Sequence, residues 1–215
     1  MARAAVFDMD GTILDTLDDL QLSLNRTLQE FGREPYSLAE VRAMVGNGVP
    51  RLIELAVGET CPDEERARVL ARFKEVYGDH CNDHTRPYPG IVAMVARLRE
   101  QGVRVAVVSN KVDFAVRELA DLHFPGVFDA VLGQRDDIPR KPDPTMVFRA
   151  LETLGVAPED ACYVGDSEVD VLTAANSGLE PLIVTWGFRS RESLIENGAT
   201  VLVDTPEELE ALILA

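Results

Sequence analysis

The sequence predicts an α/β protein with a doubly wound, mostly parallel (Rossmann-like) sheet that is interrupted by an inserted all-helical segment. Two observations support this fold class. Over most of the chain, short β-rich runs alternate with amphipathic stretches of helical length, which is typical of a parallel sheet covered by helices on both faces. After the first β-rich run, by contrast, about seventy residues show helical periodicity and no convincing strand.

The expected strands and helices follow from the local residue pattern. Strands are expected at residues 4–7, 103–108, 129–132, 161–164, 182–185 and 200–203. Helices are expected between the later strands, at residues 91–101, 113–122, 144–154 and 169–177. Two helix ends carry their own markers, because Asp143 before Pro144 fits an N-cap and first helical position, and Gly178 fits a terminating glycine.

The helical insertion divides the chain into two expected domains. Residues 1–14 and 87–215 are expected to form the α/β core, and residues 15–86 are expected to form a helical cap inserted after the first strand. Ser37 and Glu40 have the spacing of a capping box and predict a helix start inside the cap. The hydrophobic core of the cap is predicted from an apolar stripe at helical spacing, formed by Leu17, Leu20, Leu24, Leu28 and Phe31.

Composition and charge restrict the classes of partner. The 215 residues are 46% hydrophobic and 27% charged, which is enough apolar material for a sizeable core. The net charge of −16 argues against nucleic acid and against an anionic membrane surface as partners. Three cysteines without a CxxC pair predict reduced thiols rather than disulfides or a zinc site. Because no secretion signal or membrane-length apolar run is visible, we expect a cytoplasmic protein.

The strongest candidate site directly follows the first expected strand, where the sequence reads Asp8-Met9-Asp10-Gly11-Thr12. In an open parallel sheet, ligands bind at the carboxyl ends of the strands, and residues i and i+2 of an extended segment point to the same side. Asp8 and Asp10 are therefore expected to face one site. One acid after a strand is usually an ordinary turn residue, but two acids followed by Gly-Thr favour a functional site.

Three further segments are expected at the same edge of the sheet. Ser109 and Asn110 offer a hydroxyl and an amide beside a helix N-terminus, which suits an anionic oxygen. Lys141 is a cation just before a helix start, and Asp166 and Asp170 lie four residues apart at the first turn of another helix. Each segment alone is equally well explained by helix capping or solvated charge, so the prediction depends on their combination.

Together these segments place at least three carboxylates, a hydroxyl and a lysine at one sheet edge. Carboxylates that repel one another need a cation, and a donor set made only of oxygen suits Mg²⁺, which also binds phosphate. The residues therefore indicate Mg²⁺-assisted phosphoryl transfer. One carboxylate would attack phosphorus to give an aspartyl phosphate, while the metal and the lysine neutralise the phosphoryl oxygens and a second carboxylate moves protons.

Four ordered motifs resemble those of the haloacid dehalogenase-like (HAD) hydrolase superfamily: DMDGT, the strand-terminal Ser109, Lys141 within RKPDP, and GDSEVD. The resemblance covers essentially the whole chain, and the helical insertion resembles the C1-type cap of that superfamily. Residues 45–51 and 186–189 are similar to its phosphoglycolate phosphatase-like members. The resemblance thus implies a phosphatase whose substrate is a small phosphate ester, with 2-phosphoglycolate as the first candidate.

The same resemblance implies the catalytic roles. Asp8 is the expected nucleophile, Asp10 the expected general acid and base, and Ser109 and Lys141 the expected phosphoryl-binding groups. Asp10 also favours a phosphatase over a true dehalogenase, because an alkoxide leaving group needs a proton and a departing halide does not.

The metal and phosphate sites implied by the resemblance use neighbouring residues. Mg²⁺ is expected on the Asp8 carboxylate, the Asp10 backbone carbonyl and Asp166, with Asp170 in a supporting role. The expected phosphate-binding residues are Gly11, Thr12, Ser109, Asn110 and Lys141.

Arg51 is the candidate for recognising the rest of the substrate. A protein with this negative charge must supply a cation locally for the carboxylate of phosphoglycolate. Arg51 follows Gly46 and Gly48, where small residues let the backbone approach a ligand, and a guanidinium can bind a carboxylate with two hydrogen bonds. A solvated arginine on a cap helix explains the sequence equally well.

Alternative functions share part of this pattern. A phosphomutase of the β-phosphoglucomutase kind has all four motifs and differs in its cap residues. A non-enzymatic phosphoaspartate signalling or binding protein also uses acids, a hydroxyl and a lysine, but the helical insertion and the complete set of site residues argue against it. The sequence leaves the oligomeric state open.

Overall fold

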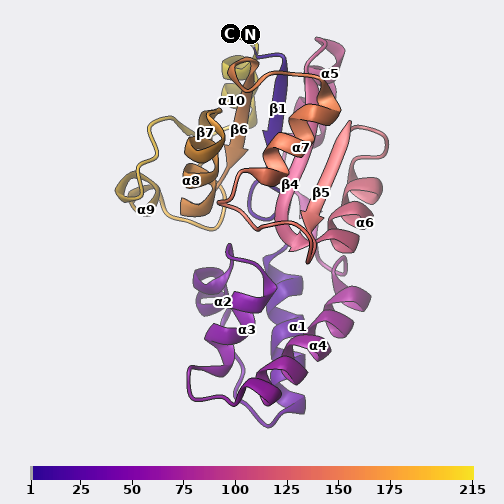
Figure 1. The fold of residues 1–215 in the computed structure, drawn as a ribbon, viewed down its shortest axis with the longest axis vertical. Coiled ribbons are helices and arrows are strands. Elements are labelled where there is room, and N and C mark those ends of the chain that lie inside the picture. Colours follow the sequence, from indigo (N-terminus) through magenta and orange to yellow (C-terminus); the bar gives the residue numbers. More distant parts are fainter. Residues whose placement is uncertain (1) are drawn as a thin grey trace.

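The computed structural model describes residues 2–215 and contains a six-stranded sheet with the order β5-β4-β1-β6-β7-β8 (Figure 1). All neighbouring strands in it are parallel, which confirms the predicted fold class. The strands are β1 (Ala4–Phe7), β4 (Arg104–Val112), β5 (Ala130–Gln134), β6 (Ala161–Gly165), β7 (Glu180–Val184) and β8 (Leu202–Val203).

Strand β1 lies inside this sheet, between β4 and β6, and is buried on both faces. Ala5 and Phe7 belong to the apolar cluster on one face, while Ala4 and Val6 belong to the cluster on the other. From β1 the strand order runs outward to β4 and β5 on one side and to β6, β7 and β8 on the other. Open α/β sheets bind ligands at the carboxyl ends of the strands where the strand order changes direction. The residues that follow β1 lie at this position.

Helices cover both faces of the sheet (Figure 1). They are α5 (Ile91–Glu100), α6 (Asp113–His123), α7 (Thr145–Leu154), α8 (Glu168–Ser177), α9 (Arg191–Glu196) and α10 (Pro206–Leu214), with a short 3₁₀ helix at Pro158–Asp160. Ile91 of α5, Val116 of α6 and Leu209 of α10 pack in one cluster, whereas Met146 of α7 and Ala174 of α8 pack in the other. Because helices pack against an apolar cluster on each face of the sheet, β-rich runs and amphipathic helices alternate along the sequence.

The predicted element boundaries need one correction that affects the site. Strand β4 continues to Val112, four residues beyond its expected end at residue 108, because it pairs again with β5 at Val112 and Gln134 after a bulge. Ser109 and Asn110 therefore lie within a bulged strand rather than in a turn before a helix. Gly178 ends α8 in the left-handed conformation, as expected. Helix α7 begins one residue later than expected, with Pro144 at its N-cap, although Asp143 still accepts a hydrogen bond from the backbone of Thr145.

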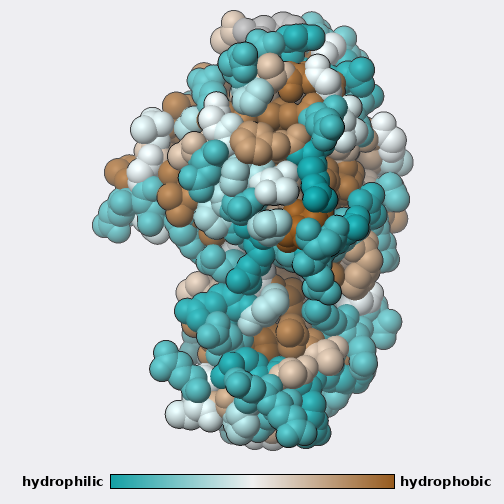
Figure 2. All heavy atoms as spheres, viewed as in Figure 1, coloured by the Kyte–Doolittle hydropathy of each residue, from teal (hydrophilic) through white to brown (hydrophobic). Residues whose placement is uncertain are grey.

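Four helices lie between β1 and the rest of the sheet domain in sequence, and they form a separate bundle beneath it (Figure 1). They are α1 (Leu17–Glu30), α2 (Leu38–Met44), α3 (Val49–Val57) and α4 (Asp63–His80). The predicted stripe is buried from Leu17 to Leu28 in a cluster of its own, against which Phe31 packs. Ser37 and Glu40 form the predicted capping box. The face shown in Figure 2 is mainly hydrophilic and narrows where the bundle meets the sheet domain.

The chain crosses between the bundle and the sheet domain through a small two-stranded ribbon that the sequence pattern did not reveal. Strand β2 (Leu14–Asp15) pairs antiparallel with β3 (Arg86–Pro87). Each strand has two residues, which is too short to show a period of two. Within the described part of the chain, no helix combines the length and the apolar character needed to cross a bilayer.

Beside this ribbon, Asp19 of α1 holds residues 84–85 in place through hydrogen bonds. Its buried carboxylate accepts hydrogen bonds from the backbone N–H groups of His84 and Thr85, from the Thr85 hydroxyl and from His84 Nδ1. Burial by itself would raise the pKa of Asp19, but these hydrogen bonds outweigh it and hold the pKa below its usual value.

We expect Asp19→Ala to lower the free energy of unfolding by about 2–3 kcal/mol, because it leaves buried donors without their charged acceptor. The lowered pKa means that this contribution is present above the ordinary Asp pKa of about 3.9 and is lost as the pH falls through the lower folded value. Urea unfolding at neutral and acidic pH measures both effects. Asp18→Ala, which removes the exposed neighbouring carboxylate, is the control, and equal losses in the two variants would contradict the prediction.

Candidate active site

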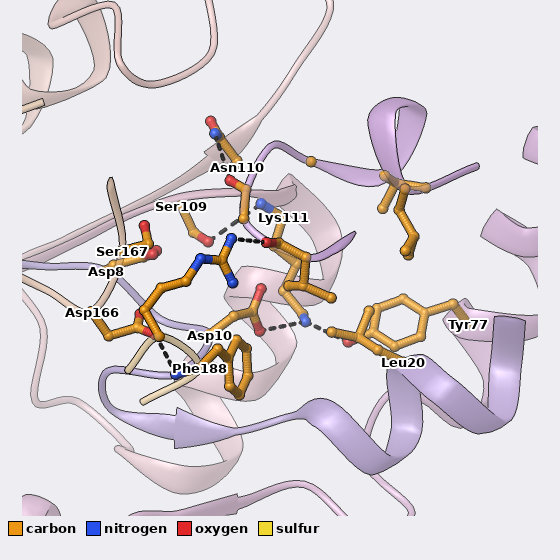
Figure 3. A pocket seen from close by; sticks show the side chains of 16 residues that line it. Asp8, Asp10, Leu20, Tyr77, Ser109, Asn110, Lys111, Asp166, Ser167 and Phe188 are labelled. Atoms are coloured by element: carbon orange, nitrogen blue, oxygen red, sulfur yellow. Dashed lines mark hydrogen bonds and ion pairs between the residues drawn. The ribbon is translucent and has the colours of Figure 1, made fainter. Parts of the chain in front are cut away.

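A narrow cavity of about 40 Å³ lies between the carboxyl edge of the sheet and the helical bundle (Figure 3). From the sheet domain it is lined by Asp8, Asp10, Ser109, Asn110, Lys111, Asp166, Ser167, Phe188 and Arg189. From the bundle it is lined by Leu20, Val45, Gly46, Gly48, Val49, Leu52 and Tyr77. Five residues that the sequence predicted for the site thus line one cavity.

Asp8 is held by only one of its two carboxylate oxygens. The backbone N–H of Asp8 continues the pairing of β1 with β6 by donating to Val164 at 2.8 Å. Its Oδ1 accepts from the backbone of Met9 at 2.7 Å and from Lys141 Nζ at 2.9 Å. Among residues 2–215, no group donates to Oδ2, so this oxygen keeps its lone pairs for a reacting atom.

The electrostatic environment of Asp8 combines burial with crowded charges. Burial raises the pKa of Asp8 to about 7, the Lys141 ammonium opposes this rise, and the carboxylates of Asp170 and Asp10 add to it. A buried carboxyl with a strongly perturbed pKa at the end of a central strand is a typical feature of an active site.

Lys141 is buried and fixed from two directions. Its Nζ donates to Asp8 and Asp170 at 2.9 Å each and to the Tyr163 hydroxyl at 2.9 Å. Its backbone N–H donates to Asn110 Oδ1 at 2.8 Å, and Asn110 Nδ2 donates back to its carbonyl at 3.1 Å. Asn110 Nδ2 also donates its second N–H to the carbonyl oxygen of Gly46 at 3.2 Å. The Asn110 side chain therefore positions Lys141, and its amide has no N–H left for the predicted contact with phosphate.

The carboxylates of Asp8, Asp166 and Asp170 form a buried cluster in which one oxygen of each lies within 4.8 Å of one oxygen of the other two. Burial, Asp170 and Asp8 raise the pKa of Asp166 well above its usual value. Lys141 is the cation in contact with this cluster, so three carboxylates face one ammonium group. A donor set of oxygens with excess negative charge fits a divalent cation such as Mg²⁺.

Asp170 has a supporting place in this cluster. Its Oδ1 accepts from Lys141 and Tyr163, and its Oδ2 accepts from the Ser167 hydroxyl and the backbone N–H groups of Asp166 and Ser167. Although burial opposes it, these partners and above all the Lys141 charge hold the pKa of Asp170 below its usual value. Asp170 thus stays ionised and fixes Lys141 and the turn that carries Asp166.

Gly11 and Thr12 serve Asp166 in this structure. Thr12 donates its hydroxyl to Asp166 Oδ1 at 3.1 Å, and the backbone of Phe188 donates to Oδ2 at 2.7 Å. Gly11 has φ = 82°, and a Cβ at this position would lie 2.3 Å from Asp166 Oδ2. Only glycine lets the loop come this close. The sequence placed both residues at the phosphate, whereas their contacts here are with the candidate metal ligand.

Asp10 is likewise held through one oxygen. Its Oδ1 accepts from Lys111 Nζ at 2.7 Å (Figure 3) and from the Thr16 hydroxyl at 2.7 Å. Within the described chain nothing donates to Oδ2. Ser109 is buried beside them, and its Oγ accepts from the backbone of Lys111 at 3.3 Å, so its own proton remains for donation.

Lys111 was missed by the sequence analysis. It follows Ser109 by two residues on the same strand, so the period of two could have placed it at the same edge. Its ammonium also donates to the hydroxyl of Tyr77 from α4 and lies 4.7 Å from the centre of that ring.

Arg51 is not among the residues that line the cavity, so the structure does not support its predicted contact with substrate. Its side chain is 47% exposed and pairs with Glu54 at 2.7 Å on the same helix. Arg189 lines the cavity instead. It pairs with Glu168 at 2.7 Å and donates to the carbonyl oxygens of Arg42 and Val45, so it joins the sheet domain to the bundle.

The fold and the arrangement of acidic residues and lysines at the sheet edge agree with one protein family. The family model described as haloacid dehalogenase-like hydrolase matches residues 5–184, which is most of the chain and includes every motif above. The chain belongs to this family and is therefore a hydrolase.

Its relatives point to one subgroup. The phosphoglycolate phosphatase of Aquifex aeolicus is 34% identical over 90% of this chain and 89% of its own length. That of Cereibacter sphaeroides is 40% identical over 86% of this chain and 85% of its own length. A crystal structure from Lactobacillus delbrueckii subsp. bulgaricus, of a protein proposed to have the same activity, superimposes with a TM-score of 0.95 at 40% identity and covers 99% of both chains.

Proposed function

We propose that the protein is a Mg²⁺-dependent phosphomonoesterase that works through an aspartyl phosphate on Asp8 and that its substrate is 2-phosphoglycolate. The family and the relatives named phosphoglycolate phosphatase make it a phosphatase. The observation that carries the mechanism is the pair Asp8 and Asp10. Each carboxylate is fixed through Oδ1 and keeps Oδ2 unengaged within residues 2–215, beside the buried ammonium groups of Lys141 and Lys111.

The proposed reaction has two steps, the formation of the aspartyl phosphate and its hydrolysis. Asp8 Oδ2 forms a bond to phosphorus while the ester P–O bond breaks, and protonated Asp10 gives its proton to the leaving alkoxide. Asp10 then takes a proton from a water molecule that attacks the aspartyl phosphate, which returns Asp8 and releases inorganic phosphate. Ser109 donates a hydrogen bond to a phosphoryl oxygen, and the Lys141 ammonium, which contacts Asp8, supplies positive charge beside the phosphoryl group.

The metal would be held by the Asp8 carboxylate, the Asp10 backbone carbonyl and Asp166, with Asp170 orienting the neighbouring groups. When bound, it supplies positive charge against the phosphoryl oxygens. The excess of carboxylates over cations in this cluster supports the assignment of a divalent ion.

The bundle of residues 15–86 would act as a cap on the α/β core of residues 1–14 and 87–215. This division is supported by the apolar cluster of the bundle, whose buried members from the sheet domain are Ala115 and Phe188, and by the ribbon of β2 and β3 at both crossings. A narrow cavity closed by apolar cap residues would exclude water and favour a small substrate. The buried free cysteines Cys61, Cys81 and Cys162 support a reducing compartment such as the cytoplasm.

A panel of phosphate esters tests the proposal. Purified protein with Mg²⁺ should release inorganic phosphate over many turnovers, fastest from 2-phosphoglycolate, and without any sugar bisphosphate. A requirement for a bisphosphate, with transfer instead of release, would identify a phosphomutase. A single stoichiometric phosphorylation without turnover would identify a signalling or binding protein.

Asp10→Asn is expected to slow hydrolysis of alkyl phosphates by about 10²–10⁴-fold, because the amide neither donates the proton to the alkoxide nor activates the water. The backbone carbonyl of residue 10 is retained. Aryl phosphates have better leaving groups, so their phosphorylation step should lose less. Single-turnover rates on both classes measure the difference, and equal losses would exclude the general-acid role.

A further inference from the structure

The carboxylate of the proposed substrate needs a cation in the cavity, and two cations line it, Lys111 and Arg189. Arg189 is already committed. Its Nε and Nη2 donate to the Glu168 carboxylate at 2.7 and 3.0 Å, and its Nη1 and Nη2 donate to the carbonyl oxygens of Arg42 and Val45. The charge of Arg189 is therefore paired with Glu168, and four of its five N–H donors are used within the described chain.

Lys111 has a donor to spare. A lysine ammonium carries three N–H donors, and the described residues accept two of them, through Asp10 Oδ1 at 2.7 Å and through the Tyr77 hydroxyl. The Lys111 side chain is only 1% exposed, so its charge is sheltered from bulk water. A charge-assisted hydrogen bond from such a group is stronger than one at the surface.

The two partners of Lys111 fix where its ammonium lies. Asp10 comes from the loop after β1, and Tyr77 comes from α4 of the bundle, where it stacks on Phe73 with ring centres 5.4 Å apart. Figure 3 shows the ammonium between the Asp10 carboxylate and the Tyr77 hydroxyl at the wall of the cavity. Its position is therefore set jointly by the sheet domain and the bundle.

This position suits the group attached to the ester oxygen. Asp10 donates its proton to that oxygen through Oδ2, and Lys111 is hydrogen-bonded to Oδ1 of the same carboxylate. The ammonium therefore lies within two hydrogen bonds and the width of a carboxylate, about 8 Å at most, of the ester oxygen. A carboxylate separated from the ester oxygen by one carbon falls inside that range. A longer leaving group would have to place its charged end in a cavity whose remaining lining includes apolar side chains such as Val49 and Leu52.

We propose that Lys111 is the specificity residue that binds the substrate carboxylate, in the place that the sequence assigned to Arg51. The proposal rests on the proposed function, because it concerns the same substrate in the same cavity. Lys111 selects phosphate esters that bear a carboxylate one carbon from the ester oxygen. Tyr77 of the bundle holds the ammonium beside Asp10.

The test compares two substrates that differ in the carboxylate. For phosphoglycolate and ethyl phosphate, the ratio of their kcat/KM values measures recognition of that group, and because both leaving groups are alkoxides, any disturbance of Asp10 affects both. The wild type should strongly favour phosphoglycolate. Lys111→Met and Lys111→Gln should reduce the ratio by about tenfold to a hundredfold, mainly through KM for phosphoglycolate.

Binding without turnover provides a second readout. Calorimetry with Mg²⁺ present compares 3-phosphonopropionate, which replaces the ester oxygen of phosphoglycolate by carbon, with propylphosphonate, which lacks the carboxylate. The wild type should bind the first more tightly, and the Lys111 variants should lose that preference. Lys74→Met, which removes an exposed lysine from α4, is the matched control and should keep both the kinetic and the binding preference.

The outcomes separate the two proposals. A wild type that hydrolyses no phosphate ester would overturn the proposed function. A wild type that prefers phosphoglycolate, with the same substrate ratio and ligand preference in folded Lys111 variants, would overturn the role of Lys111 and leave the function standing. Thermal unfolding of each variant establishes that it is folded, and the calorimetric comparison applies even to a variant with little activity.

Discussion

Asp8→Asn should reduce phosphatase turnover to background while the protein remains folded. An amide oxygen does not attack phosphorus as a carboxylate does, so no aspartyl phosphate forms. Stability should not fall, because the substitution relieves repulsion with Asp10 and Asp170 that helps to raise the pKa of Asp8. The asparagine Oδ1 still accepts from Met9 and Lys141.

Two measurements check this prediction. Steady-state phosphate release gives the turnover, and rapid quenching with ³²P-labelled substrate traps the phosphorylated enzyme. The wild type should incorporate label and the variant should not. Asp18→Asn, at an exposed carboxylate of α1, should behave as the wild type. Substantial turnover or labelling by folded Asp8→Asn protein would show that another group is the nucleophile.

Removal of divalent metal should abolish activity, and Mg²⁺ should restore it. The donor set of Asp8, Asp166 and Asp170 has an excess of negative charge that Lys141 alone does not balance. The protein should also be more stable with Mg²⁺, because an ion that binds only the folded state raises the unfolding temperature with its concentration.

Phosphate release in EDTA and thermal unfolding over a Mg²⁺ titration measure the two effects. Asp166→Asn should weaken the Mg²⁺-dependent rise in unfolding temperature as well as activity, whereas Asp18→Asn should change neither. Full activity in chelator, or an unfolding temperature that does not respond to Mg²⁺, would contradict the metal assignment.

Most of the core site was predictable because its residues sit at fixed places in the sheet. Parallel strands bring their carboxyl ends to one edge, so Asp8, Ser109 and Asp166 could be assigned to one site although they are far apart in sequence. The strand ends themselves were less certain. The bulge that carries β4 on to Val112 depends on pairing with β5, which no local pattern contains.

Which group each polar side chain of the site contacts was decided only by the tertiary structure. The sequence offered Asn110 and Thr12 as phosphate ligands, yet the side chain of Asn110 is occupied by the backbone of Lys141 and that of Thr12 by Asp166. Which partner a hydroxyl or an amide finds depends on distances between loops that follow different strands.

The sequence by itself determined the fold class, the inserted helical segment and the chemistry of the sheet edge, because alternation, helical periodicity and acidic strand ends are local properties. The tertiary structure alone decided which cations line the cavity. Successive helix residues turn by about 100°, so the docking of α3 sends Arg51 to solvent. The buried charge of Lys111 is compensated by Asp10 and Tyr77, which lie 101 and 34 residues away and meet it only when the bundle packs on the sheet.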